Sequence, residues 1–203
     1  MRDKYHVKTN SNHFFYPQDW IKMMKLAKKK QRESLMVLIN TGARINEARH
    51  ITLEDFDLER NSLILRITKV RAKKKEYKPM PRHIPVSSQF IKHIKKMAKI
   101  YDLYPDSPIP MLKSPALTNA IKKLAKDVGI KEWVDYSNHN VRKTFECWLI
   151  ALGNDGFKVA KHLGHTPSVA LNSYISPDIF TPDDKKLMRE VLGDLYGYRE
   201  HRF

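Results

Sequence analysis

The chain has 203 residues, enough for one large domain or two small ones, and 41% of them are hydrophobic, so a packed core can form. Lysine and arginine number 38 against 22 aspartates and glutamates, and the formal charge of +16 favours a polyanionic partner because phosphate contacts release counterions. The single cysteine, Cys147, excludes an internal disulfide, and no stretch approaches the roughly 18 apolar residues of a membrane span, so we expect a cytoplasmic protein without a membrane partner.

The amino-terminal part predicts three helices. Residues 1–15 are mostly polar and carry no clear period, so we interpret them as a lead-in or the remnant of a linker. A helix is expected to open at Tyr16-Pro17-Gln18-Asp19, because proline and acidic residues are favoured in a first turn. Apolar spacing predicts two more helices, at about 33–40 and 45–51.

The period then changes to that of strands. Alternating apolar residues and a turn at Arg60-Asn61 predict a small antiparallel sheet of three strands, at 56–58, 63–68 and 82–86. Residues 69–80, between the second and third strands, form a basic excursion with no apolar alternation. From Arg66 to Arg82 eight residues are lysine or arginine, and Glu76 is the only acidic one.

From Ser87 onward the pattern is helical again, interrupted by a proline-rich connection at 104–115. Helical spacing and breakers such as Gly129 predict helices at about 87–101, 117–128, 139–152, 155–163, 167–174 and 182–195. Cys147 lies in one of these apolar patterns and is expected to be a buried, inert thiol. The expected fold class is therefore α+β and mainly helical, with a small three-stranded antiparallel sheet.

Four short elements occur in a fixed order. Residues 41–47 read T-G-x-R-x-x-E, His139 and Arg142 form H-x-x-R, and residues 163–165 read L-G-H. Arg142 precedes the histidine of L-G-H by 23 residues, and Tyr174 follows that histidine by nine. This combination resembles the catalytic set of the tyrosine recombinases, and the resemblance covers roughly residues 16–195.

Strand cleavage by a tyrosine needs a nucleophile, stabilisation of the phosphate oxygens and a proton donor for the leaving 5′-oxygen. A free phenol has a pKa of about 10, so about one molecule in a thousand is ionised at neutral pH. Cationic neighbours reduce that deficit, and arginine suits the task because its planar fork grips two oxygens of one phosphate. Histidine can accept the phenol proton or donate to a phosphoryl oxygen. None of these tasks requires a metal ion or another cofactor.

The resemblance assigns the catalytic roles. Arg44 and Arg142 would be the two arginines on the scissile phosphate, with His139 as the H-x-x-R partner of Arg142. His165 would hydrogen-bond a phosphate oxygen, and Tyr174 would be the nucleophile. The family also places a lysine on the turn of its small sheet as general acid.

Lys69, at the end of the second strand, is our choice for the general acid, although the long hairpin contains competing lysines. Lys143 stands where many members have histidine. We interpret the basic residues near the site as phosphate contacts and not as base readers. The candidate DNA-binding residues are Arg71, Lys73, Lys74, Lys75, Lys78 and Lys143.

Each element taken alone also has an ordinary structural explanation. Arg44 could be a simple helix-start residue, His139 a helix cap, and Arg142 the partner of Glu146 across one turn. His165 could be a carboxyl-terminal cap and Tyr174 a buried aromatic. The joint spacing favours the catalytic interpretation. The residues outside the motifs are expected to be structural or on the surface: Tyr136, Tyr196, Tyr198, His6, His13, His50, His83, His93 and His162.

The resemblance implies a catalytic domain at 16–203, with the separate helical domain that usually precedes it absent. The expected function is site-specific recombination of double-stranded DNA through a 3′-phosphotyrosine, by an integrase of a virus or plasmid, with an archaeal source hinted at by lysine usage. A Xer-like dimer resolvase and a catalytically silent DNA-binding module are the alternatives. Leu187, Val191, Leu192 and Leu195 could belong to a tail that docks on a neighbouring protomer of a tetramer, or to a helix packed on its own domain.

Overall fold

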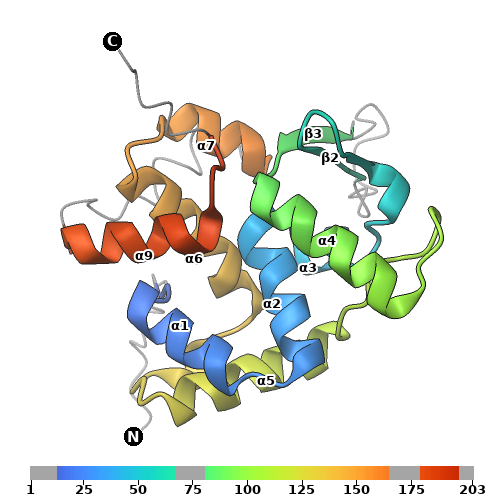
Figure 1. Ribbon diagram of the computed structural model, residues 1–203. Helices are drawn as coiled ribbons and strands as arrows, with labels where there is room; N and C mark the ends of the chain where they lie inside the picture. The colour runs from blue at the N-terminus through green and yellow to red at the C-terminus, as the bar shows by residue number, and fades with distance from the viewer. Residues whose placement is uncertain (1–12, 67–80, 165–178, 197–203) are drawn as a thin grey trace, which may run out of the picture.

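The computed structural model describes residues 13–66, 81–164 and 179–196 (Figure 1). Most of these residues are helical, and a small antiparallel sheet lies at one end of the helical assembly, which confirms the expected fold class. The helices are α1 (Pro17–Leu26), α2 (Lys29–Thr41), α3 (Ile45–Ala48), α4 (Ser88–Tyr101), α5 (Ser114–Asp127), α6 (Asn138–Ala151), α7 (Gly156–Leu163) and α9 (Pro182–Leu192). Two 3₁₀ turns accompany them, at Leu53–Asp55 and Trp133–Asp135.

The sheet has the order β1 (Phe56–Asp57), β2 (Ser62–Leu65) and β3 (Arg82–Pro85). Leu63 pairs with Ile84 in the antiparallel β2–β3 ladder, and both side chains are buried on the face that packs on the helices. The predicted second strand reached residue 68, and its last two residues lie outside the described part of the chain. The predicted helix at 167–174 lies outside it as well.

Local capping explains where the helices depart from their predicted ends. Helix α2 begins four residues before the predicted start at 33, because the N–H of Lys28 donates to Gln31 Oε1 at 2.9 Å and starts a polar first turn. Helix α3 ends at Ala48, not at 51. Helix α9 ends at Leu192, not at 195, because Gly193 adopts a positive φ of 64° and breaks the helix.

Helix α6 is the centre of the core and contacts α2, α5, α7 and α9. Its residues are buried along nearly the whole length, Trp148 and Cys147 among them. The chain before α1 is tied to this helix, since the Phe15 N–H donates to Thr144 Oγ1 at 2.9 Å and Trp148 Nε1 donates to the Phe15 carbonyl at 3.0 Å. Phe15, placed in the lead-in segment by the sequence, is therefore part of the core. Burial raises the pKa of the Cys147 thiol to about 12, which agrees with an inert thiol.

None of the helices in the described ranges is long and apolar enough to span a bilayer.

Candidate active site

A tight turn between α2 and α3 positions Arg44. Gly42 ends α2 with a φ of 58°, a left-handed conformation that glycine adopts without strain. A Cβ at this position would lie 2.5 Å from Phe145 Cδ1, so the turn packs directly on α6. Arg44 then precedes α3 as its N-cap, with 49% of its side chain exposed. The turn thus presents one arginine to solvent from a rigid support.

Glu47 of α3 stabilises this turn by accepting hydrogen bonds from two arginines. The carboxylate is almost fully buried and accepts hydrogen bonds from the Arg44 backbone N–H at 2.9 Å and from Arg44 Nη1 at 3.0 Å. Arg82, at the start of β3, donates to both oxygens, Nη1 at 3.2 Å and Nη2 at 3.0 Å. Burial opposes ionisation of Glu47, but these hydrogen bonds and the two guanidinium charges outweigh it and lower its pKa.

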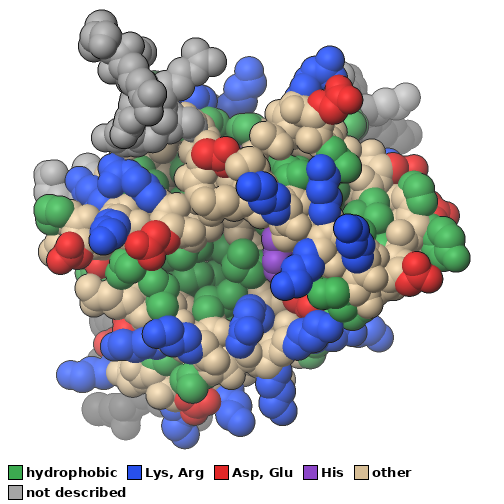
Figure 2. All heavy atoms as spheres, viewed as in Figure 1, with side chains coloured by type: hydrophobic (Ala, Val, Ile, Leu, Met, Phe, Trp, Pro, Cys, Tyr) green, Lys and Arg blue, Asp and Glu red, His purple; other side chains and the backbone are tan. Residues whose placement is uncertain are grey.

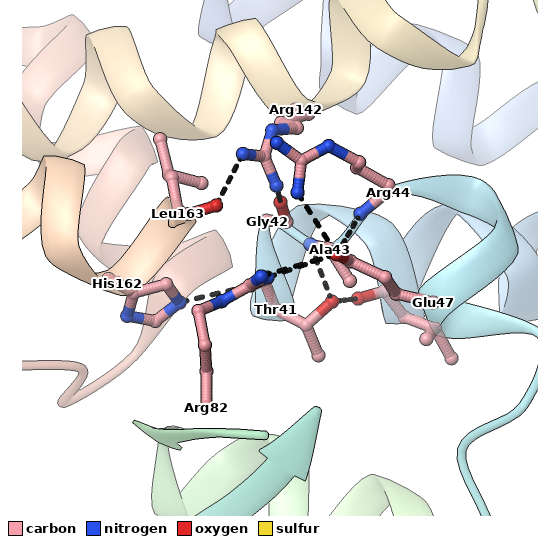
Figure 3. Close-up of polar contacts among 10 residues, drawn as sticks. Thr41, Gly42, Ala43, Arg44, Glu47, Arg82, Arg142, His162 and Leu163 are labelled. Atoms are coloured by element: carbon pink, nitrogen blue, oxygen red, sulfur yellow. Dashed lines mark hydrogen bonds and ion pairs between the residues drawn. The ribbon is translucent and has the colours of Figure 1, made fainter. Parts of the chain in front are cut away.

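Arg142 lies on α6 and is 2% exposed, one of the largest fully buried side chains. Its Nη1 donates to the Gly42 carbonyl at 2.7 Å and its Nη2 donates to the Leu163 carbonyl, so one guanidinium joins the α2–α3 turn to the end of α7 (Figure 3). Burial and then the nearby Arg44 charge lower the pKa of Arg142 to about 9. Arg142 therefore remains a cation at neutral pH.

The guanidinium groups of Arg142 and Arg44 lie beside each other above Gly42, and Arg82 approaches from β3 on the opposite side (Figure 3). Within the described residues, Arg142 Nε and Arg82 Nε are buried and make no hydrogen bond. The guanidinium groups of Arg44 and Arg82 pair with the carboxylate of Glu47, and that of Arg142 lies near it. The arrangement can bind a tetrahedral anion such as a phosphodiester and stabilise extra negative charge on it.

His139 lies in the first turn of α6 and is exposed. The cap of this helix is Ser137, whose Oγ accepts the His139 N–H at 3.3 Å, so His139 is not the capping side chain. Its position three residues before Arg142 puts both on one side of the helix. Lys143 follows Arg142 and is partly exposed.

The remaining predicted site residues lie outside the described residues, and their roles stay predictions. They are Lys69, Arg71, Lys73, Lys74, Lys75, Lys78, His165 and Tyr174. Gly164, the described residue nearest to His165, ends α7 with a φ of 66° and follows Leu163, whose carbonyl accepts a hydrogen bond from Arg142. His165 therefore follows directly after a backbone segment that the Arg142 guanidinium anchors.

Two further members of this cluster were given no part in the site by the sequence, and His162, expected to be structural or on the surface, is the first of them. It is buried on α7, with Nε2 3.0 Å from the Thr41 carbonyl and Nδ1 2.6 Å from Tyr196 Oη. Because a carbonyl only accepts, Nε2 must carry the proton and Nδ1 accepts from the Tyr196 hydroxyl. Burial lowers the pKa of His162 to about 4. A neutral histidine thus ties α7 and the carboxyl-terminal segment to the turn that carries Arg44.

The second is Arg82, for which the sequence offered only a place at the start of a strand. Its partner Glu47 belongs to the T-G-x-R-x-x-E element but had no assigned role. The two residues are 35 positions apart, and only the packing of β3 against the α2–α3 turn brings them together. No periodic signal could have predicted this pair.

Figure 2 shows an apolar hollow on the face formed by α1, α2, α4 and α9, with lysine and arginine around it. It encloses about 560 Å³ and is lined by Trp20, Met24, Met36, Phe90 and Val191 among others. None of the arginines of the candidate site lines it. In the described ranges, no three histidine, cysteine, aspartate or glutamate side chains are grouped as a metal would need.

Comparison with known proteins identifies the family. The model of the phage integrase family matches residues 13–179, most of the chain and all four motifs. The chain belongs to the phage integrase family. A curated relative, tyrosine recombinase XerA of Saccharolobus solfataricus, is 29% identical over 151 residues, which cover 72% of this chain and 47% of that protein. The chain thus spans about half the length of the curated relative it matches.

Solved structures agree on the fold. A crystal structure of XerA recombinase superposes with a TM-score of 0.65 at 16% identity, covering 88% of this chain and 62% of that one. The Tn1549 transposon integrase in complex with transposon right end DNA gives 0.66 at 18% identity, covering 91% and 67%. XerH site-specific recombinase bound to difH substrate gives 0.59 at 18% identity, covering 80% and 49%. The likeness establishes the fold of this phage integrase family member.

Proposed function

We propose that this chain is the catalytic part of a site-specific DNA recombinase that cleaves and rejoins strands through a 3′-phosphotyrosine. The observation that carries the proposal is the joint anchoring of Arg44 and Arg142. The two arginines are 98 residues apart in sequence, yet the carbonyl of Gly42, two residues before Arg44, accepts a hydrogen bond from the Arg142 guanidinium. Membership of the phage integrase family supports DNA strand cleavage as the reaction in which this cationic cluster takes part.

In the proposed reaction the Tyr174 oxygen attacks the scissile phosphorus and the bond from phosphorus to the 5′-oxygen breaks. His139 or His165 accepts the phenol proton, and Lys69 donates a proton to the departing 5′-oxygen. Arg44 and Arg142 stabilise the charge that builds on the non-bridging oxygens. Attack of a 5′-hydroxyl on the phosphotyrosine then reverses these transfers and rejoins a strand. No oxidant, cofactor or nucleotide is consumed.

The proposed substrate is double-stranded DNA. The formal charge of +16 supports a polyanionic partner, and the Tn1549 integrase and XerH structures are complexes with DNA. The basic residues proposed to contact phosphates are Arg71, Lys73, Lys74, Lys75, Lys78 and Lys143. We further propose a domain boundary just before residue 13, since Phe15 belongs to the core, a separate DNA-clamping domain in the working enzyme, and a tetramer on DNA joined through the carboxyl-terminal tail.

Two biological roles remain within this chemistry. Integration of a viral or plasmid genome is the first, supported by the family match and the likeness to a transposon integrase. Resolution of chromosome or plasmid dimers is the second, supported by the 29% identity to XerA of Saccharolobus solfataricus. Recombination of paired sites on one plasmid, compared with sites on two plasmids, separates the two roles.

A trapping assay tests the shared chemistry. The probe is a pool of short duplexes with a randomised sequence around a nick placed so that the cleaved 5′-end diffuses away. Wild-type protein should form a protein–DNA adduct that survives denaturant, and Tyr174→Phe should form none. A catalytically silent DNA-binding module would shift the pool in a gel but give no adduct with either protein, and that result would reject the proposal.

A further inference from the structure

Arg82 makes a two-pronged ion pair with a buried carboxylate under the candidate site. Its guanidinium donates from Nη1 and Nη2 to separate oxygens of Glu47, at 3.2 and 3.0 Å. The Arg82 side chain is 14% exposed and that of Glu47 only 3%. This planar geometry is the one in which arginine binds a carboxylate most strongly, and lysine cannot reproduce it.

The same carboxylate also holds Arg44. Arg44 Nη1 lies 3.0 Å from Glu47 Oε1, while about half of the Arg44 side chain stays exposed. Among the described residues, Arg82 and Arg44 are the two cations paired with Glu47. If Arg82 were absent, the buried charge would depend on Arg44 alone, and burying a charge with too few partners is costly. The Arg44 guanidinium would then be drawn inward, away from a substrate.

Arg82 also supports the segment that leads to the predicted histidine. A Cβ on Gly164 would come within 2.7 Å of Arg82 Nη1 and 2.9 Å of its Cδ, so the arginine packs directly against this glycine. Gly164 immediately precedes His165. Helix α7 and β3 are in contact at this point. One side chain therefore contacts the support of Arg44 and the backbone before His165.

We propose that Arg82 is a positioning residue: it neutralises Glu47 so that the charge of Arg44 is available to the scissile phosphate. Glu47 then fixes the α2–α3 turn without cancelling the positive charge presented above it. The inference rests on the proposed strand-cleavage function and adds a residue outside the motifs that define it. The role is indirect, since Arg82 acts through Glu47 and Arg44.

The test compares Arg82→Met, Glu47→Gln and the double variant in single-turnover cleavage of a nicked duplex, using a sequence recovered from the randomised pool. Arg82→Met should form the covalent adduct about 100-fold more slowly than wild type, similar to the loss of one charge-stabilising donor. The double variant should form the adduct at least about 10-fold faster than Arg82→Met, because without the carboxylate nothing draws Arg44 inward. A double variant as slow as Arg82→Met would overturn the proposal.

A second substrate separates positioning from general damage to the fold. In a methylphosphonate duplex one anionic oxygen of the scissile phosphate is replaced by a neutral methyl group, so less charge has to be neutralised. On this substrate the ratio of the wild-type rate to the Arg82→Met rate should be at least about 10-fold smaller, because the effect of Arg82 depends on the charge that Arg44 presents to the phosphate. An equal deficit on both substrates would mean that Arg82 merely supports packing, and would reject the positioning role.

Two further variants serve as controls for correct folding. Arg82→Lys keeps the charge and loses the fork, so it should stay folded and lose less activity than Arg82→Met. Arg60→Met removes an exposed arginine that pairs with Asp57 at 2.9 Å in the turn between β1 and β2, and should cleave like wild type. If wild-type protein forms no adduct, the proposed function fails. If it does and Arg82→Met is equally fast, only the role of Arg82 fails.

Discussion

We predict that the stability of the fold depends on pH through His162. The buried imidazole donates from Nε2 to the Thr41 carbonyl and accepts the Tyr196 hydroxyl at Nδ1. Protonation would place a cation in the core, near the positive charges of Arg82 and Arg142. Burial, the largest cause, therefore lowers the His162 pKa from 6.5 to about 4. Above about pH 6.5 His162 is neutral in the folded and unfolded states, so it takes up no proton on unfolding.

Between about pH 6.5 and 4 the unfolded chain binds a proton that the folded chain excludes, so stability falls as the pH falls. At about 1.4 kcal/mol per pH unit, the gap between 6.5 and about 4 corresponds to a total loss of about 3 kcal/mol from His162. About 2 kcal/mol of this should be lost by pH 5. Such a loss is a large share of the stability of about 5–15 kcal/mol that domains usually have.

Urea unfolding of wild type and His162→Gln at a series of pH values measures the effect. The variant should lose about 1–2 kcal/mol at neutral pH from poorer hydrogen bonding, yet fall less steeply on acidification, so that the two stabilities converge near pH 5. His83→Gln, which removes an exposed histidine of β3, should retain the wild-type slope. Parallel curves for wild type and His162→Gln would refute the buried neutral imidazole.

Three further outcomes are expected. Gly42→Ala should lower the free energy of unfolding by about 2–4 kcal/mol, because the added Cβ would lie 2.5 Å from Phe145 and the position has a positive φ. Gly153→Ala, which also has a positive φ but open space around it, should cost about 1 kcal/mol in the same urea titration. Equal losses would contradict the packed turn. Arg142→Lys should slow adduct formation at least about 100-fold, since lysine cannot bridge two carbonyls and a phosphate, and an unchanged rate would exclude Arg142 from the chemistry. DNA affinity should fall about 10³- to 10⁵-fold between 50 and 200 mM salt. Neutralising lysines 73–75 should reduce the slope of log affinity against log salt concentration by about 1 for each phosphate that these lysines bind. A salt-independent affinity would exclude phosphate binding.

The fold class could be predicted because the spacing of hydrophobic residues along the chain matches the helices and strands that bury them. The change to strand spacing after residue 55 placed all three strands, and the proline-rich connection correctly separated α4 from α5. The start of α2 was missed because its first turn, Lys29–Arg32, is polar and carries no apolar signal. Capping by a side chain, not burial, decides where that helix begins.

The sequence predicted some residues of the site and missed others. Arg44 and Arg142 could be singled out because each lies in a short motif whose spacing is fixed along the chain. The contacts around them could not, since Glu47 meets Arg82, and His162 meets Thr41, across long separations in sequence. His162 was assigned a structural role, and its two buried hydrogen bonds agree with one. Such pairings depend on how the elements pack, and no local pattern encodes that.

The central claim is that Tyr174 becomes covalently joined to a DNA 3′-phosphate. Mass spectrometry of the trapped adduct after nuclease and trypsin digestion tests it directly. The tryptic peptide from His162 to Lys185 contains Tyr174 as its only tyrosine, so a nucleotide mass on this peptide identifies the nucleophile. In wild-type protein that mass is expected on this peptide. A nucleotide on the peptide that carries Tyr196, or on any other, would contradict it.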